Sequence, residues 1–288
     1  MSVPGSASVA VLRYAAFTTD PASGNPAGVV LGANRLGAAE MLALAREVGH
    51  SETAFLTARA AAAGAYDVRY FSPEAEVPFC GHATIAAAVA LAERGAPRDL
   101  VFHVAPGPVH VRTGHDRGGV PTASLTSVPP RVAPAPSELV DAALTALGWT
   151  APELDPALPV RVADAGARHL IIAAATRARL ATLRYDYERL RAIMAAAALT
   201  TVDLVWREAD DRFHARNPFP VGGVYEDPAT GSAAAALGAY LRDLGLVVAP
   251  AHVTVRQGDD MGRPSRLEVD IPAGTGGVSV TGAAVPIP

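Results

Sequence analysis

Three side chains of the types that move protons lie at the edges of apolar segments: Glu52, His82 and Asp227. Glu52 comes between a glycine-terminated segment and the apolar Phe55-Leu56. A carboxylate buried in such a place has a raised pKa, so that it can take up and return a proton near neutral pH. The alternative is a solvated glutamate at a strand end, since glutamate is usually exposed.

His82 follows Gly81 at the start of an apolar, alanine-rich segment. We expect it in the first turn of a helix, where the positive end of the helix dipole disfavours a protonated imidazole. A neutral imidazole there could exchange a hydrogen bond or a proton with a substrate, and Gly81 would let a ligand approach the backbone closely. A purely structural histidine is the alternative.

Asp227 belongs to the stretch EDPATGS, residues 226–232, which precedes a second apolar helix. Its carboxylate could hold a donor such as an imidazole or a substrate hydroxyl, or it could merely cap the helix. Ser232 and the backbone N–H groups beside it would bind an anion, because a helix start presents unpaired donors. The alternative is that Thr230 or Ser232 serves only as a cap.

Cys80, the only cysteine, immediately precedes Gly81. A helix N-terminus can lower the pKa of a thiol, which would make Cys80 reactive. The second half of the chain has no cysteine to act with it, and small buried cysteines commonly serve in packing. Both points weigh against a thiol base at Cys80, whose role the sequence leaves open, and a single cysteine excludes an internal disulfide.

Two similar helices are expected to position these residues. The chain reads GHATIAAAVALAERG from Gly81 and GSAAAALGAYLRDLG from Gly231, an offset of 150 positions that also relates SETAFL (51–56) to TVDLVW (201–206). Self-similarity at a fixed period predicts a duplicated unit. Each helix is apolar all round at its N-terminal end, so each should be buried in its own half. We expect the repeat to place His82 and Asp227 at equivalent positions that line one cleft.

Strands outnumber helices and come in runs, which predicts an α+β fold rather than a parallel doubly wound sheet. Other helices are expected at 38–48, before Gly49, and at 137–147, where Ser137 could be the cap. The proline-rich segment 128–136 should be a stiff junction.

The predicted domains follow from that junction. Residues 1–127 would form the N-terminal domain, with the C-terminal strand 278–288 joining it, and residues 128–277 the second domain. At 288 residues the chain is long enough for two cores.

Composition excludes several classes of function. The net charge of −4 argues against nucleic acid as a partner, and no apolar run is long enough to cross a membrane. All 24 basic residues are arginine, which excludes a Schiff-base lysine and a phosphate-loop lysine. No zinc-type spacing of histidines or cysteines occurs, so we expect no metal and no cofactor. The N-terminus shows no secretory signal, which favours the cytoplasm.

Five motifs, in order along the chain, resemble the PhzF-like isomerase family of phenazine biosynthesis. They are GNPAGVV (24–30), SETAFL (51–56), FCGHAT (79–84), EDPATGSA (226–233) and QGDDMGRPS (257–265). The resemblance implies the diaminopimelate-epimerase fold, in which two pseudo-symmetric domains each wrap a β-barrel-like sheet around a central buried helix. It also implies a homodimer.

The resemblance further implies roles for individual residues. Glu52 would be the acid/base that shifts a proton between carbons, with His82 and Asp227 as further catalytic residues. The substrate contacts would come from Ser51, Gly81, Gly231 and Ser232.

The predicted function is therefore a cofactor-independent isomerase of a small carboxylated substrate. One alternative is an amino-acid epimerase or racemase, disfavoured because such enzymes use two opposed cysteines. The other is a non-catalytic ligand-binding protein on the same fold.

Overall fold

The structure is a computed structural model that describes residues 10–60 and 62–288. The chain forms two compact units. Unit 1 contains the N-terminal part up to Pro21, Pro26–Ala123 and Ala283–Pro288, and unit 2 contains Ala22–Asn25 and Ser124–Gly282.

The unit boundaries differ from the predicted ones by a few residues. Unit 2 begins at Ser124 instead of 128, the C-terminal return begins at Ala283 instead of 278, and the short segment Ala22–Asn25 belongs to unit 2. The reason is that two strands, β8 (Pro121–Thr126) and β17 (Ser279–Pro286), run from one unit into the other. A boundary inside a strand leaves no change of composition to read in the sequence.

Unit 1 is a sheet that closes on itself. Its strands are β1 (Val11–Ala16), β2 (Asn25–Leu31), β3 (Glu52–Ala58), β4 (Ala65–Phe71), β5 (Glu76–Val77), β6 (Asp99–Val104) and β7 (Gly107–His115), with parts of β8 and β17. Pairing runs from β17 through β1, β2, β3, β4, β6 and β7 to β8, and β8 pairs again with β17. The pairs β2–β3 and β4–β6 are parallel.

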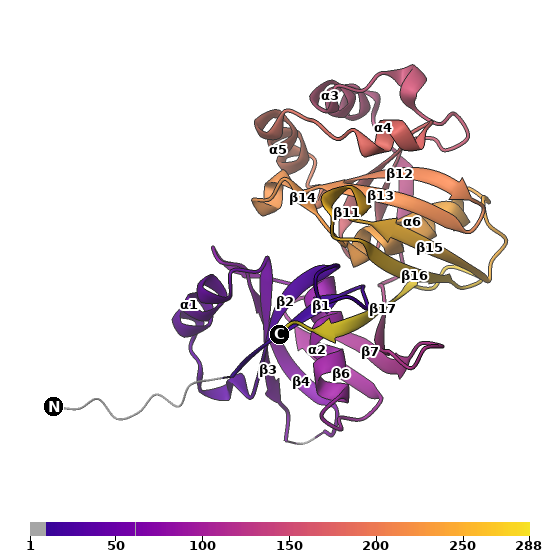
Figure 1. Cartoon of the computed structure of the whole chain (residues 1–288). Coiled ribbons are helices and arrows are strands. Elements are labelled where there is room, and N and C mark those ends of the chain that lie inside the picture. The colour runs from indigo at the N-terminus through magenta and orange to yellow at the C-terminus, as the bar shows by residue number, and fades with distance from the viewer. Residues whose placement is uncertain (1–9, 61) are drawn as a thin grey trace. The chain divides into compact units, whose positions relative to one another are not determined.

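Helix α2 (Gly81–Ala92) lies among these strands (Figure 1). Every residue from His82 to Leu91 is buried, and half of them are alanine. A helix enclosed on all sides has no solvated face, and alanine keeps the strands close to its axis. Outside the sheet, α1 (Ala38–Val48) buries only one face and ends at Gly49, which has a φ of 70°. Both helices begin where the sequence predicts.

Unit 2 repeats this plan around α6 (Gly231–Asp243). Its strands are β9 (Arg131–Pro134), β10 (Arg161–Asp164), β11 (Arg168–Ala173), β12 (Thr201–Ala209), β13 (Arg212–Pro218), β14 (Glu226–Asp227), β15 (Ala251–Gln257) and β16 (Ser265–Ile271). The parallel pairs β11–β12 and β13–β15 correspond to β2–β3 and β4–β6 of unit 1. The predicted duplication is confirmed.

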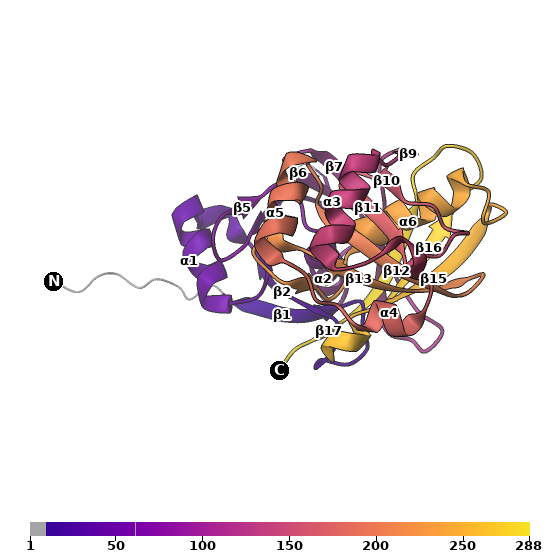
Figure 2. The ribbon, with the colours of Figure 1, turned by 90° about the horizontal axis from the view of Figure 1, so that it is seen from above.

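The outer helices of unit 2 form a layer of their own. Helices α3 (Ser137–Leu147), α4 (Arg177–Ala181) and α5 (Tyr187–Ala196) lie on one side of β12 and β13, and α3 lies beside α5 (Figures 1 and 2). Their apolar faces and the strands share one hydrophobic core. The N-cap of α3 is Pro136, so the expected cap Ser137 is the first helical residue. Strand β9 forms within the segment expected to be only a junction, because its backbone pairs with β10.

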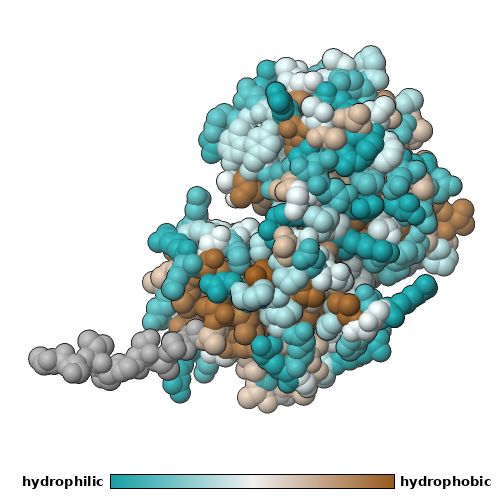
Figure 3. Space-filling model, in the orientation of Figure 1, coloured by the Kyte–Doolittle hydropathy of each residue, from teal (hydrophilic) through white to brown (hydrophobic). Residues whose placement is uncertain are grey.

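Figure 3 shows one face of the molecule, with hydrophilic residues prevailing over unit 2 and hydrophobic ones gathered over the strands of unit 1. Among the described residues the exposed large hydrophobic side chains are few: Val128, Val221, Val224, Tyr225 and Val248. No helix in the described part of the chain is both long enough and apolar enough to span a membrane.

A single glycine shows how tightly α6 fits its sheet. A Cβ atom at Gly238 would lie 2.9 Å from Cγ1 of Val269 and 2.9 Å from Cγ1 of Val278. We predict that Gly238→Ala destabilises the protein by about 1–3 kcal/mol, because overpacking outweighs the better helix propensity of alanine. The measurement is urea unfolding, with Gly276→Ala as control because no heavy atom would lie within 4 Å of its Cβ. Equal stability of the two variants would contradict this view of the packing.

Candidate active site

Glu52 is placed by the junction between α1 and β3. The helix ends at Gly49, and β3 begins at Glu52 in parallel register with β2, so that Ala27 lies opposite Glu52 and Gly28 opposite Thr53. A Cβ atom at Gly28 would lie 2.5 Å from Oγ1 of Thr53. Only glycine fits there, which explains the second glycine of the motif GNPAGVV.

Four side chains of unit 1 form one cluster with Glu52 at its centre. The Cys80 thiol donates to Oε2 of Glu52 at 3.5 Å, and Nε2 of His82 lies 3.4 Å from the same oxygen. The Ser51 hydroxyl is 3.2 Å from Nε2 of His82, and the Cys80 sulfur is 3.3 Å from Nδ1. The structure therefore brings together three of the predicted site residues, Glu52, His82 and Ser51, and adds Cys80.

The cluster lies largely out of solvent. The side chains of Glu52 and His82 are 15% and 6% exposed, so Glu52 is not the solvated strand-end residue of the alternative interpretation. Burial raises the pKa of the Glu52 carboxyl, and hydrogen bonds from Ser51 and Cys80 offset part of that rise. A carboxyl held in this way releases its proton closer to neutral pH than an ordinary glutamate does.

Hydrogen bonds of two buried hydroxyl groups fix the first turn of α2. The Thr84 hydroxyl donates to the carbonyl of Cys80 at 2.7 Å, and the fully buried Tyr70 hydroxyl lies 2.6 Å from the Thr84 oxygen. These contacts tie the first turn of the helix to β4. Cys80 and His82 consequently have little freedom to move away from Glu52.

The same cluster has the donor types of a metal site. One oxygen of Glu52, the sulfur of Cys80 and one ring nitrogen of His82 lie within 4.8 Å of one another. Zinc is bound by such ligands. The distances between Cys80 and its two neighbours are also those of thiol hydrogen bonds, so the cluster needs no ion to hold together.

Asp227 belongs to a second cluster, in unit 2. It lies in β14 opposite Asn217 of β13. Its Oδ1 accepts from the Asn25 amide at 2.8 Å, and its Oδ2 accepts from the Thr230 hydroxyl at 2.6 Å. Thr230, the N-cap residue of α6, makes no side-chain capping bond to the described backbone. The Thr230 hydroxyl holds Asp227 instead of capping the helix.

Three of the sequence motifs meet at this second cluster. The Gln257 amide donates to the carbonyl of Asp227 at 2.7 Å and accepts from the backbone N–H of Thr230 at 2.9 Å. Asn25 also donates to the carbonyl of Ala229 at 3.1 Å. The motifs GNPAGVV and QGDDMGRPS thus hold the loop EDPATGSA in shape. All three motifs are recognisable in the sequence, but nothing in the sequence alone indicates a role for Asn25 or Gln257.

The structure corrects the predicted equivalence of His82 and Asp227. At the offset of 150 positions, β14 with Asp227 corresponds to β5 with Val77, whereas His82 corresponds to Ser232 in the first turn of α6. Both residues lie near a helix start, but Asp227 belongs to a two-residue strand before the helix, which is too short to be recognised in the sequence. Ser232, in turn, lies 3.1 Å from Nε2 of His169, a residue that no sequence motif indicated.

The chain was compared with known proteins. Residues 14–288 match the family model described as "Phenazine biosynthesis-like protein". The chain belongs to this family. That match covers the five motifs and both clusters.

Relatives of the chain include a trans-2,3-dihydro-3-hydroxyanthranilate isomerase of Pseudomonas chlororaphis, 30% identical over 88% of this chain and 86% of that one. An uncharacterised isomerase of Bacillus subtilis is 29% identical over 96% and 95% of the two chains. The crystal structure of a PhzF-family protein of Bacillus anthracis, 26% identical, covers 97% of each chain with a TM-score of 0.86. The chain is an enzyme of the isomerase class, and the predicted fold is confirmed.

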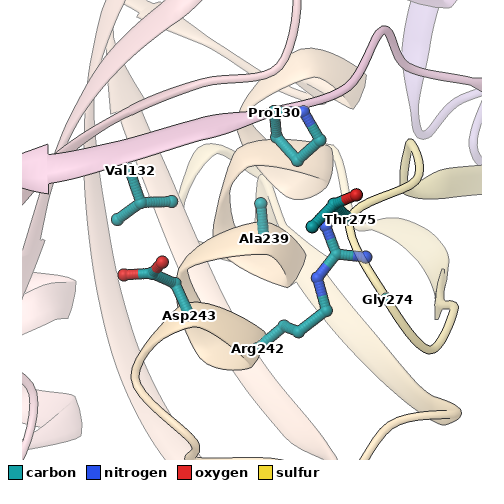
Figure 4. Close-up of a pocket in the computed structure, with 7 residues that line it drawn as sticks. All are labelled: Pro130, Val132, Ala239, Arg242, Asp243, Gly274 and Thr275. Atoms are coloured by element: carbon teal, nitrogen blue, oxygen red, sulfur yellow. The ribbon is translucent and has the colours of Figure 1, made fainter.

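Unit 2 also has a pocket of about 230 Å³ beside the C-terminal end of α6 (Figure 4). It is lined by Pro130, Val132, Ala239, Arg242, Asp243, Gly274 and Thr275. The Arg242 guanidinium already donates to the carbonyls of Pro272 and Gly276. None of the predicted site residues lines this pocket.

The hydrogen bond from Cys80 gives a testable effect on Glu52. That bond stabilises the ionised carboxylate, so Cys80→Ala should raise the Glu52 pKa further above its usual range. The measurement is titration of the Glu52 side-chain carboxyl by ¹³C NMR. Cys80→Ser, which keeps a donor, should stay close to the wild type. A lower pKa in Cys80→Ala would show that the thiol does not donate to Glu52.

Proposed function

We propose that this chain is a cofactor-independent isomerase that moves a proton between two carbons of a small carboxylated molecule, with Glu52 as the acid/base. The observation that carries the proposal is the buried Glu52 carboxyl, whose pKa is raised and which contacts both Cys80 and His82. The relative from Pseudomonas chlororaphis is named for an isomerisation of a hydroxyanthranilate.

The proposed reaction needs one group with two protonation states. Ionised Glu52 takes a proton from a carbon next to an unsaturated or carbonyl group, and the electron pair of the broken C–H bond moves into the substrate. Protonated Glu52 then returns the proton to a different carbon, so no atom is gained or lost. Burial stabilises the protonated intermediate state of Glu52, since it penalises the charged form. His82 and Ser51, which touch each other beside Glu52, hold the substrate or pass the proton.

The substrate carboxylate would be held by backbone donors. Gly81 begins α2, and Gly231 with Ser232 begins α6. Helix starts bind anions through N–H groups and the helix dipole. We propose Asp227, fixed by Asn25 and Thr230, as a further catalytic residue in unit 2. The cytoplasmic location and the homodimer stay predictions.

An epimerase of the two-thiol type is a weaker candidate. Such a mechanism needs a second cysteine, and Cys80 is the only one in the sequence. The position that corresponds to Cys80 is Thr230, whose hydroxyl donates to Asp227. A hydroxyl used in this way is not a carbon base.

Replacing Glu52 tests the proposal directly. With trans-2,3-dihydro-3-hydroxyanthranilate in D₂O, Glu52→Gln should lose deuterium incorporation by at least about 100-fold, the usual size of an acid/base contribution. The measurement is mass spectrometry of substrate and product. Glu74→Gln is the control, because Glu74 is an exposed glutamate of the same unit. Undiminished exchange in Glu52→Gln would overturn the assignment.

The pH profile gives a second test. Below the Glu52 pKa the free enzyme holds a protonated carboxyl that cannot accept a proton, so kcat/KM should fall as the pH decreases through that pKa. Because the pKa is raised, this acidic limb should lie above the range of an ordinary glutamate. A kcat/KM that stays constant down to pH 4 would contradict Glu52 as the base.

A further inference from the structure

A chain of buried polar side chains in unit 2 ends at Ser232. Asn217 donates to Oδ1 of Asp203 at 3.0 Å, and the Thr201 hydroxyl donates to Oδ1 of Asn217 at 2.5 Å. Nδ1 of His169 lies 2.8 Å from the Thr201 oxygen, and Nε2 lies 3.1 Å from the Ser232 oxygen. Ser232 is the only member that reaches solvent, being half-buried.

The other four members are costly to bury. His169, Thr201 and Asn217 are 0% exposed and Asp203 is 1% exposed. Oδ2 of Asp203 has no hydrogen-bond partner among the described residues. An apolar core would avoid this cost, since unsatisfied buried polar atoms destabilise a fold. Stability therefore does not explain this series of hydrogen-bonded side chains. Its one partly exposed member, Ser232, belongs to the proposed substrate site.

The donor of each hydrogen bond in this series can be identified by beginning at Asp203. Burial raises the pKa of Asp203 to about 7, and its Oδ1 accepts from the NH₂ group of Asn217, so the Asn217 carbonyl faces Thr201. Thr201 has one hydroxyl proton, which it donates to Asn217. Its oxygen can then only accept from His169.

The tautomer of His169 then determines which group donates in the hydrogen bond between His169 and Ser232. Nδ1 must carry the ring proton in order to donate to Thr201, so in a neutral ring Nε2 has a lone pair. Burial lowers the pKa of His169 to about 3, which keeps the ring neutral. The Ser232 hydroxyl must therefore donate its proton to Nε2.

We propose that His169 is a positioning residue, which turns the Ser232 proton inward so that the Ser232 oxygen accepts a hydrogen bond from an amino or hydroxyl group of the substrate. This inference rests on the proposed function, because it takes the start of α6 as part of the substrate site. The backbone N–H groups of the helix start would still take the carboxylate. A substrate with a carboxylate and a neighbouring N–H or O–H donor fits both.

His169 acts here through Ser232 and not as a base. A ring with so low a pKa holds a proton too weakly to activate a serine as a nucleophile. Ser232 is thus a hydrogen-bond acceptor with a fixed orientation, and the chain from Asp203 sets that orientation.

The first experiment reads the His169 tautomer in the wild-type protein. In a ¹⁵N–¹H long-range correlation spectrum, Nδ1 should show the shift of a protonated nitrogen and Nε2 that of an unprotonated one. Thr201→Val removes the acceptor for Nδ1 and should abolish this single-tautomer signature, and Thr201→Ser should restore it. The opposite tautomer in the wild type, or no change in Thr201→Val, would overturn the proposal.

The second experiment measures what Ser232 recognises, using two small carboxylates by calorimetry. Anthranilate carries an amino donor beside its carboxylate, and benzoate lacks it. The wild type should prefer anthranilate, and Ser232→Ala should reduce that preference by about 5-fold, the value of one hydrogen bond. Thr201→Val should reduce it too, and Thr201→Ser should restore it. An unchanged preference in Ser232→Ala would overturn the proposal.

These readouts separate the two proposals. Neither requires turnover, so a failure of Glu52 as the acid/base would leave the tautomer and the ligand preference unchanged. Conversely, full deuterium exchange by a protein whose His169 has the opposite tautomer would overturn only the role of His169.

Discussion

The constraint on which both units depend is the burial of an entire helix inside a sheet. A helix that contacts strands on every side must be narrow and apolar, which is why α2 and α6 are rich in alanine. Where the axis is closest, even a methyl group is too large, as at Gly238 beside Val269 and Val278. The surrounding strands also fix the position of the first turn of each helix. Polar side chains at the helix start are therefore held in fixed positions.

That enclosure also accounts for the chemistry of the first cluster. The start of α2 brings Cys80 and His82 against the first residue of β3, and the surrounding sheet removes solvent from Glu52. The pKa of the Glu52 carboxyl is raised, because the loss of solvation destabilises its charged form more than the nearby hydrogen-bond donors stabilise it. Proton affinity here is a consequence of packing, not of a charged neighbour.

Local sequence patterns were enough to predict α1, α2, α3 and α6, but they could not predict contacts between residues that lie far apart in the sequence. The ends of α1 and the beginnings of α2 and α6 are marked by glycines. The bond between Asn25 and Asp227 joins residues 202 positions apart, and the pair His169 and Ser232 is separated by 63. Such contacts form only when distant strands pair in the folded sheet. The two-residue strands β5 and β14 are, in addition, too short to show a periodic pattern in the sequence.

The duplicated plan makes the difference between the units informative. At equivalent strand starts unit 1 has Ser51 and Glu52, and unit 2 has Thr201 and Val202. Ser51 contacts His82 directly, whereas Thr201 reaches Ser232 only through the interposed His169. At the position equivalent to Glu52, unit 2 thus has a valine, and its buried polar side chains lead instead to the single hydroxyl of Ser232. This difference is in keeping with the proposed shift of a proton by Glu52, which needs one acid/base and not two opposed ones.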